Sequence, residues 1–384
     1  MESALCPRCG NDIFEEISSL DQQTPESHHH AIEDKKAEWY TRCLTEKLNV
    51  GEHDSAPQTH QEQHDQPRTE QAQHRADELA YLQTISRAEL LKESAARKKW
   101  WSSLSTDWKE VIKTTLKVHH DPTDQEILAF FEITNLRCDN RRIHNLLPIR
   151  PLDKLQQLRC DESPVEDLEP LRNHEKLQRL YAFDCDFSSL EPLRHLKSLK
   201  LLWISSTQVS SLEPLSELLN LEELYCSETS ITDLSPLKKL LNLEKLSCYK
   251  TGVSSLQAIS HLENLIELGI NNSKISDLSP LAGLANLEYL RCSKTSINSI
   301  EALRNLSELR ELSLAQTPLT SIEALEELEN LEELDISGTL VTSIAPIMHL
   351  RQLERVELSR GSVPDDEIER FVALHPECDL VLKP

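Results

Sequence analysis

Apolar and polar positions repeat along most of this chain with a period of 22 residues. The most regular apolar position carries leucine ten times and valine once, with no insertion or deletion between copies. A fixed period of this length is typical of a solenoid, in which each unit covers its apolar edge with its neighbours. The residues at this position are Leu136, Leu158, Leu180, Leu202, Leu224, Leu246, Leu268, Leu290, Leu312, Leu334 and Val356.

Within one repeat, the spacing of the apolar residues changes along the chain. The apolar residues Leu224 and Cys226 alternate with Tyr225 and Ser227. This period of two predicts a strand with one buried face. The leucines within 234–240 are then three residues apart, as in a helical turn. Pro236 suits the first turn of a helix, where a missing N–H loses no partner. Each repeat is therefore predicted to contain a short strand followed by a short helical turn.

The most complete copy runs from Leu221 to Asn242 and begins Leu-Glu-Glu-Leu-Tyr-Cys-Ser-Glu-Thr-Ser-Ile-Thr-Asp-Leu-Ser-Pro-Leu. This pattern resembles the leucine-rich repeat, in the 22-residue class known from protein phosphatase regulators and bacterial internalins. The resemblance covers residues 132–384. It implies an α/β solenoid curved as a horseshoe, with eleven repeats, parallel strands on the concave side and helical or 3₁₀ turns on the convex side. Such horseshoes commonly bind a protein on the concave side.

A hydroxyl side chain recurs at the position where this repeat family usually has asparagine. We interpret these hydroxyls as a ladder that bonds backbone groups of the bend between adjacent rungs. The alternative, a row of phosphorylatable residues, conflicts with the burial expected for stacked positions. The residues are Thr207, Thr229, Thr251, Thr295, Thr317, Thr339, Ser163 and Ser273.

The ends of the solenoid, residues 132–362, are expected to be covered, because a solenoid end exposes apolar surface. Residues 76–131 have apolar residues at helical spacing and resemble the helical cap of bacterial cytoplasmic leucine-rich repeat proteins. We assign Trp100, Trp101 and Trp108 to the core of this cap rather than to binding. Residues 363–384 are expected to cap the other end.

The first 75 residues differ from the rest in composition. Residues 51–75 are rich in Gln, His, Glu and Asp and have almost no apolar residues, so we predict a disordered linker. Within residues 1–50, the Cys6-Pro-Arg-Cys9-Gly sequence resembles a zinc knuckle, since two thiolates two residues apart can chelate one metal. Cys43 and His28, in a run of three histidines, are candidates to complete a structural zinc site. The alternative is a reduced cysteine pair without metal.

Charge and cysteine content restrict the partners and the compartment. The formal net charge of −24 argues against nucleic acid and against anionic membrane surfaces, both of which need clustered Lys and Arg. No secretory signal or membrane-spanning stretch is recognisable. Cysteines at the inward strand position, such as Cys226 and Cys248, are expected to be buried free thiols. The alternative is that they form disulfides between rungs. Stacked free thiols suit a reducing compartment, so we expect a cytoplasmic protein.

The outward strand positions define the candidate binding surface. Aromatic residues make up 4% of the chain, yet Tyr181, Trp203 and Tyr225 occupy one outward position on three consecutive rungs. Strands about 4.8 Å apart bring such residues into contact. Phe183, Tyr249, Arg159, Arg179 and Arg291 complete the set of candidate binding residues. Clustered Trp, Tyr and Arg are typical of an interface hot spot, whereas the alternative is that cross-strand pairs only stabilise the sheet.

These observations favour a binding protein over an enzyme. The sequence contains no phosphate-binding loop, nucleophile elbow or metalloprotease motif. We therefore expect a non-catalytic adaptor, inhibitor or regulatory subunit that binds a protein on its concave face. In the alternative, the protein bridges two partners, and its N-terminal zinc module binds the second. The concave residues Glu311, Glu333, Asp335 and Glu357 are expected to meet a basic region of the partner.

Overall fold

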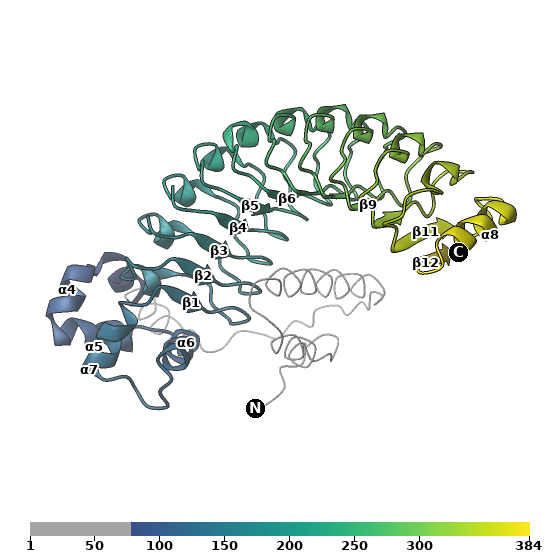
Figure 1. Ribbon diagram of the computed structural model, residues 1–384. Coiled ribbons are helices and arrows are strands. Elements are labelled where there is room, and N and C mark those ends of the chain that lie inside the picture. The colour runs from purple at the N-terminus through teal and green to yellow at the C-terminus, as the bar shows by residue number, and fades with distance from the viewer. Residues whose placement is uncertain (1–77) are drawn as a thin grey trace, which may run out of the picture. The chain divides into compact units, whose positions relative to one another are not determined.

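A computed structural model describes residues 78–384. These residues form a single parallel sheet whose twelve strands follow one another in chain order. In Figure 1 the strands lie along the inner side of an arc of rungs, and the helical turns lie along its outer side. This is the solenoid architecture that the 22-residue period predicts.

The strands pair at the predicted register. Leu224, for example, is paired with Leu202 on one side and Leu246 on the other, so residues 22 apart are neighbours. The strands are β1 (Asn135–Arg137), β2 (Gln157–Arg159), β3 (Arg179–Tyr181), β4 (Leu201–Trp203), β5 (Glu223–Tyr225), β6 (Lys245–Ser247), β7 (Glu267–Gly269), β8 (Tyr289–Arg291), β9 (Glu311–Ser313), β10 (Glu333–Asp335), β11 (Arg355–Ser359) and β12 (Asp379–Lys383).

The predicted helical turns are 3₁₀ turns. Most of them have proline at their first or second position, where a missing N–H costs no hydrogen bond. They are η1 (Leu147–Ile149), η2 (Glu169–Leu171), η3 (Glu191–Leu193), η4 (Glu213–Leu215), η5 (Ser235–Lys239), η6 (Gln257–Ile259), η7 (Ser279–Leu281), η8 (Glu301–Leu303), η9 (Glu323–Leu325) and η10 (Ala345–Ile347).

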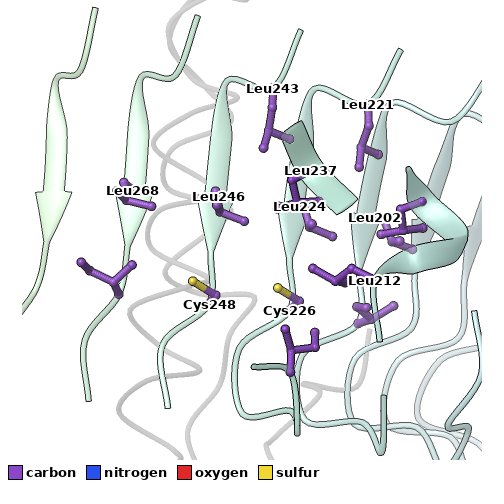
Figure 2. Packing of buried hydrophobic residues seen from close by; sticks show 14 of the residues in the cluster. Leu202, Leu212, Leu221, Leu224, Cys226, Leu237, Leu243, Leu246, Cys248 and Leu268 are labelled. Carbon is purple, nitrogen blue, oxygen red and sulfur yellow. The ribbon is translucent and has the colours of Figure 1, made fainter. Parts of the chain in front are cut away.

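One continuous hydrophobic core runs through all the rungs. Figure 2 shows the repeat leucines of neighbouring strands, such as Leu224 and Leu246, pointing to the same side of the sheet. Cys226 and Cys248 lie beside them and are fully buried. The core is thus built from equivalent residues stacked rung upon rung, as the repeat pattern predicts.

The hydroxyl ladder forms at the bends that follow the strands. The Thr207 hydroxyl donates to the carbonyl of Ile204 at 2.7 Å, three residues earlier in the same rung. The five other threonines at this position repeat the bond at 2.6–2.7 Å. The hydroxyl of Ser163 instead donates to the carbonyl of Cys138, in the preceding rung. The predicted bonding of these hydroxyls to backbone groups of the bend is therefore confirmed for the six threonines, and each bond closes within one rung.

A helical cap covers the first rung. It contains α4 (Arg87–Lys92), α5 (Ser94–Ser102), α6 (Thr106–Leu116) and α7 (Asp124–Phe130). Trp100 and Trp108 are buried in its core, and the Trp108 indole Nε1 donates to the carbonyl of Asn145 at 3.0 Å. Trp101 is only partly buried against the same core. The predicted packing role is therefore confirmed for Trp100 and Trp108.

The C-terminal tail forms a helix and a further strand of the sheet. Helix α8 (Asp365–Leu374) follows β11, and the chain then returns to the sheet as β12. This strand pairs with β11 over five residues, from Asp379 to Lys383. The tail thus adds a twelfth strand to the eleven that the repeats supply. No helix within residues 78–384 is long and apolar enough to cross a membrane.

Candidate protein-binding surface

Aromatic side chains of three adjacent strands meet on the concave face. Tyr181, Trp203 and Tyr225 are direct register partners on β3, β4 and β5. The Trp203 ring centroid lies 6.4 Å from that of Tyr181 and 5.1 Å from that of Tyr225. Phe183 lies 6.0 Å from Trp203, centroid to centroid. We call Tyr181, Phe183, Trp203 and Tyr225 the aromatic patch, and Trp203 is its centre.

The members of the aromatic patch differ in exposure. Tyr181 and Phe183 are buried, with 7% and 8% of their surface exposed. Trp203 and Tyr225 are half-buried. The Tyr225 hydroxyl donates at 2.8 Å to Glu223, two residues earlier on the same strand. The accessible part of the patch is therefore formed by Trp203 and Tyr225, and the buried rings of Tyr181 and Phe183 contact Trp203.

A buried ion pair supports one side of the patch. The Arg159 guanidinium carbon lies 4.9 Å from the Tyr181 ring centroid, in a cation–π contact. Its Nε donates to Asp161 at 2.6 Å, and the other carboxylate oxygen of Asp161 accepts the Phe183 N–H at 3.0 Å. Burial raises the pKa of Asp161, although Arg159 and the Phe183 N–H act in the opposite direction. Arg159 is thus a support for the aromatic ring as well as a candidate contact residue.

Leu201 also belongs to this surface, although we did not predict it from the sequence. Leu201 precedes the repeat leucine of β4, and it stands between Arg179 and Glu223 in the sheet. At 7% exposed it extends the apolar area beside the aromatic patch. The sequence could have indicated this, because a leucine stands here at an outward position that carries charged residues on both neighbouring rungs. Arg179 is exposed at the edge of this area.

Tyr249 and Arg291 lie on later rungs of the concave face and have different surroundings. Burial and the nearby Glu228 carboxylate raise the pKa of Tyr249. Arg291 is held by carboxylates on both sides, at 2.7 Å from Glu267 and 2.7 Å from Glu311. Burial opposes the charge of Arg291, but these two carboxylates raise its pKa overall. Arg291 is therefore a member of a charge network rather than of the aromatic patch.

Most of the acidic side chains on the later rungs form ion pairs within this chain, which leaves them less available to a basic partner. Glu311 is paired with Arg291, Glu357 with Arg355, and Asp335 with Lys383. Glu333 differs from these three: burial and the nearby Glu311 raise its pKa. Three of the four carboxylates that we expected to contact a basic partner are therefore already paired with a basic side chain of this chain.

The predicted zinc ligands Cys6, Cys9, His28 and Cys43 lie outside the residues that the structure describes. Within residues 78–384 there is no group of three or more His, Cys, Asp or Glu side chains that could hold a metal ion. The described cysteines are free thiols. Burial raises the pKa of Cys248 to about 12, and burial together with Asp379 raises that of Cys378. These thiols are protonated at neutral pH and are poor nucleophiles.

Comparison with known proteins agrees with this architecture. The family model described as leucine-rich repeats (2 copies) matches residues 219–263, 285–327 and 307–351. No curated protein sequence matches the chain.

Among solved structures, internalin C2 of Listeria monocytogenes is 32% identical, with 53% of this chain and 90% of that chain covered and a TM-score of 0.51. Another internalin of the same organism is 23% identical, covering 72% and 94%, with a TM-score of 0.55. The functional domain of InlJ, also from Listeria monocytogenes, is 19% identical, covering 72% and 68%, with a TM-score of 0.58. The last two share the fold. With its unbroken 22-residue register and this likeness to internalin C2, the chain belongs to the leucine-rich repeat proteins.

Proposed function

We propose that this protein is a non-catalytic adaptor, inhibitor or regulatory subunit that binds a protein partner on its concave face. The leucine-rich repeat fold is generally a protein-interaction module. The observation that carries the proposal is the position of Trp203, whose ring contacts Tyr181, Phe183 and Tyr225 at the concave surface. Trp203 is the anchor, and the neighbouring rings hold it in place before the partner arrives.

The composition of the surface supports recognition over a purely structural role. Cross-strand aromatic pairs stabilise a sheet by about 0.2–1 kcal/mol each. The later rungs form the same strands with Ser247, Gly269 and Ser313 at the equivalent position, so the fold does not require aromatic residues there. Tryptophan, tyrosine and arginine gathered at one place are the residues that most often contribute the binding energy of protein interfaces. The partner therefore presents an apolar side chain to Trp203 and an acceptor or carboxylate to Arg179.

Two properties of the described cysteines support a non-catalytic protein of the cytoplasm. The raised pKa of the buried thiols argues against cysteine nucleophiles and thus against cysteine-based catalysis. Six buried thiols without a disulfide suit a reducing compartment, which favours the cytoplasm. The second function predicted from the sequence, bridging two partners through an N-terminal zinc module, depends on residues 1–50 and is tested separately.

The proposal is tested by affinity purification from native cytoplasm, followed by mass spectrometry. The wild-type chain is compared with the Trp203→Ala/Tyr225→Ala variant, which removes the two accessible rings. A matched control, Leu219→Ala/Leu241→Ala, removes two exposed apolar side chains that lie outside the strands. Circular dichroism and thermal unfolding establish that both variants fold.

A partner that is retained by wild type and by the control, and is lost from the concave variant, supports the proposal. Each interface anchor is worth about 2 kcal/mol or more, so loss of two, about 4 kcal/mol together, weakens binding by roughly a thousandfold. If every partner is retained by the concave variant, the aromatic patch is not the binding site. If a partner is instead lost when residues 1–75 are deleted, the result favours the bridging function.

A further inference from the structure

The two ends of the sheet are finished differently. At the first end, helix α6 contacts β1, and the cap buries Trp100, Phe130 and Phe131 in one core with the first rung. At the other end, β12 has β11 as its one neighbour among the described residues. An edge strand presents unpaired N–H and C=O groups that can pair with another strand. The end formed by β12 is thus the open side of the solenoid.

The main chain of β12 presents alternate residues to its two sides. The Asp379 N–H donates to the carbonyl of Glu354 at 2.8 Å, and the Lys383 carbonyl accepts from the Arg360 N–H at 2.8 Å. In a parallel pair, residues two apart on a strand turn their N–H and C=O to the same neighbour. Residues 379, 381 and 383 therefore face β11. Leu380 and Leu382 turn their N–H and C=O groups away from it, toward the open edge.

The side chains of β12 are complementary to themselves in the antiparallel direction. The strand reads Asp379-Leu-Val-Leu-Lys383. If it pairs with a second copy about a two-fold axis at Val381, Asp379 lies opposite Lys383 of the second copy, and Leu380 lies opposite Leu382 of the second copy. The outward-facing N–H and C=O groups of Leu380 and Leu382 then form the hydrogen-bonded pairs of an antiparallel ladder. The main-chain hydrogen bonds, the apolar contacts and the charge pairs are therefore all compatible with the same antiparallel register, centred on Val381.

We propose that β12 is a dimerisation edge, at which two copies of this chain join their sheets antiparallel about a two-fold axis through Val381. The interface is isologous, so it closes at two copies and does not grow into a filament. The covered first end, where α6 lies against β1, prevents a head-to-tail alternative.

Apolar exposure at this end favours a partner over solvent. Leu380, Val381 and Leu382 are all partly exposed, whereas the repeat leucines of the inner strands are fully buried. Helix α8, which precedes β12, exposes Val372 at 48% and Leu374 at 46%. A second strand alongside β12 covers Leu380 and Leu382 in the way that each rung covers the one before it.

The charges at the strand ends fit the same register. Asp379 is 2.9 Å from Arg355, and Lys383 contacts Asp335 at 3.2 Å and also Glu357. In the dimer, Asp379 lies between Arg355 and Lys383 of the second copy, so the signs alternate across the joint. The residue after the strand is Pro384, which lacks an N–H. It falls opposite Cys378 of the second copy, whose N–H is already bonded to the His375 carbonyl.

A charged residue and a proline also protect edge strands from association. This alternative interpretation predicts a monomer, so the two interpretations give opposite results in solution. Sedimentation velocity of the full chain over a range of concentrations distinguishes a 43.9 kDa monomer from a species of twice that mass.

A disulfide test locates the joint. Opposed residues at a non-hydrogen-bonded position have Cα atoms about 4.5 Å apart, within disulfide range, so Val381→Cys is expected to cross-link two copies on mild oxidation. The control is Ser359→Cys on β11, whose copies would lie several strand spacings of about 4.8 Å apart, beyond reach. Both variants keep the other cysteines, so the difference reports on position 381. Equal cross-linking in the two variants, or none in either, overturns the proposal.

A charge exchange tests the register. Asp379→Lys alone and Lys383→Glu alone each place like charges opposite one another twice, and each is expected to weaken dimerisation on the order of tenfold. Mixing the two variants places opposite charges at both positions, so the mixture is expected to dimerise again. Recovery in the mixture also shows that both variants fold. A mixture no tighter than the separate variants would refute the antiparallel register.

Discussion

The imidazole Nε2 of His174 lies 3.1 Å from the carbonyl oxygen of Ile149, which belongs to the preceding rung. A carbonyl only accepts, so Nε2 carries the proton in this bond. His174 is buried, and its Nδ1 has no hydrogen-bond partner among the described residues. Burial lowers the pKa of His174, and the nearby backbone carbonyls of Ile149 and Leu171 act in the opposite direction. The protein therefore folds around a neutral histidine.

This geometry predicts a loss of stability in mild acid. Because the folded pKa of His174 lies below its unfolded value near 6.5, the unfolded state takes up the proton first as pH falls. The contribution is fully present above pH ~6.5 and decreases below it, by at most about 1.4 kcal/mol per pH unit until the folded pKa is reached. Urea unfolding of wild type and His174→Gln at pH 7.5 and 5.5 measures this. Equal pH dependence in the two proteins would contradict the assignment.

The helical cap is predicted to be stabilised by Trp100 and hardly at all by Trp101. Trp100 is fully buried and meets Phe131 edge to face, with ring centroids 5.1 Å apart. Trp100→Ala should lower the free energy of unfolding of the cap by about 3–5 kcal/mol, through lost burial and a cavity. Trp101→Ala is the matched control and should cost clearly less, about 1 kcal/mol, because this side chain is only partly buried. Hydrogen exchange of helices α5–α7 reports the difference, and similar effects of the two changes would exclude the assigned roles.

One backbone position of each rung is left-handed, and this predicts two opposite stability changes. Ser206 has φ of 56°, and Gly338 occupies the equivalent position six rungs later with φ of 70°. A left-handed residue with a side chain costs about 1–2 kcal/mol, and glycine avoids most of this but is more flexible when unfolded. Ser206→Gly should therefore be neutral or stabilising by up to about 1 kcal/mol.

The reverse change, Gly338→Ala, should destabilise by about 1 kcal/mol or more. An added Cβ would also lie 2.9 Å from the Cγ of Gln316. Thermal unfolding of both variants tests the pair, and changes of the same sign would show that backbone strain does not govern this position.

The zinc module predicted for residues 1–50 is testable without a structure of that region. We predict about one zinc per chain in the purified protein, bound by Cys6, Cys9, Cys43 and His28. The Cys6→Ser/Cys9→Ser variant should lose the metal, whereas Cys378→Ser, a control within the described residues, should retain it. Elemental analysis by mass spectrometry gives the ratio of zinc to protein. A wild-type chain free of zinc after preparation without chelators would refute the module.

Most of the fold could be predicted from the sequence, because in a repeat the residues that pair between strands are those one period apart along the chain. Once Leu224 and Leu246 are recognised as equivalent, the strand register follows, and so does the stacking of Cys226 on Cys248. The concave position of Tyr181, Trp203 and Tyr225 follows from the same register. The strand β12 escaped prediction because its sequence departs from the repeat, and only its pairing with β11 identifies it.

The sequence by itself determined the period, the parallel sheet and which side chains share its concave face, since all three depend only on residue spacing. The tertiary structure decided which of those side chains touch, and how far each is exposed. Tyr181 is buried while Trp203 remains accessible, Leu201 joins the apolar area, and Arg159 is held by Asp161. These outcomes depend on side-chain orientation and on neighbours 22 residues away. Spacing fixes which residues are neighbours, whereas packing decides how their atoms meet.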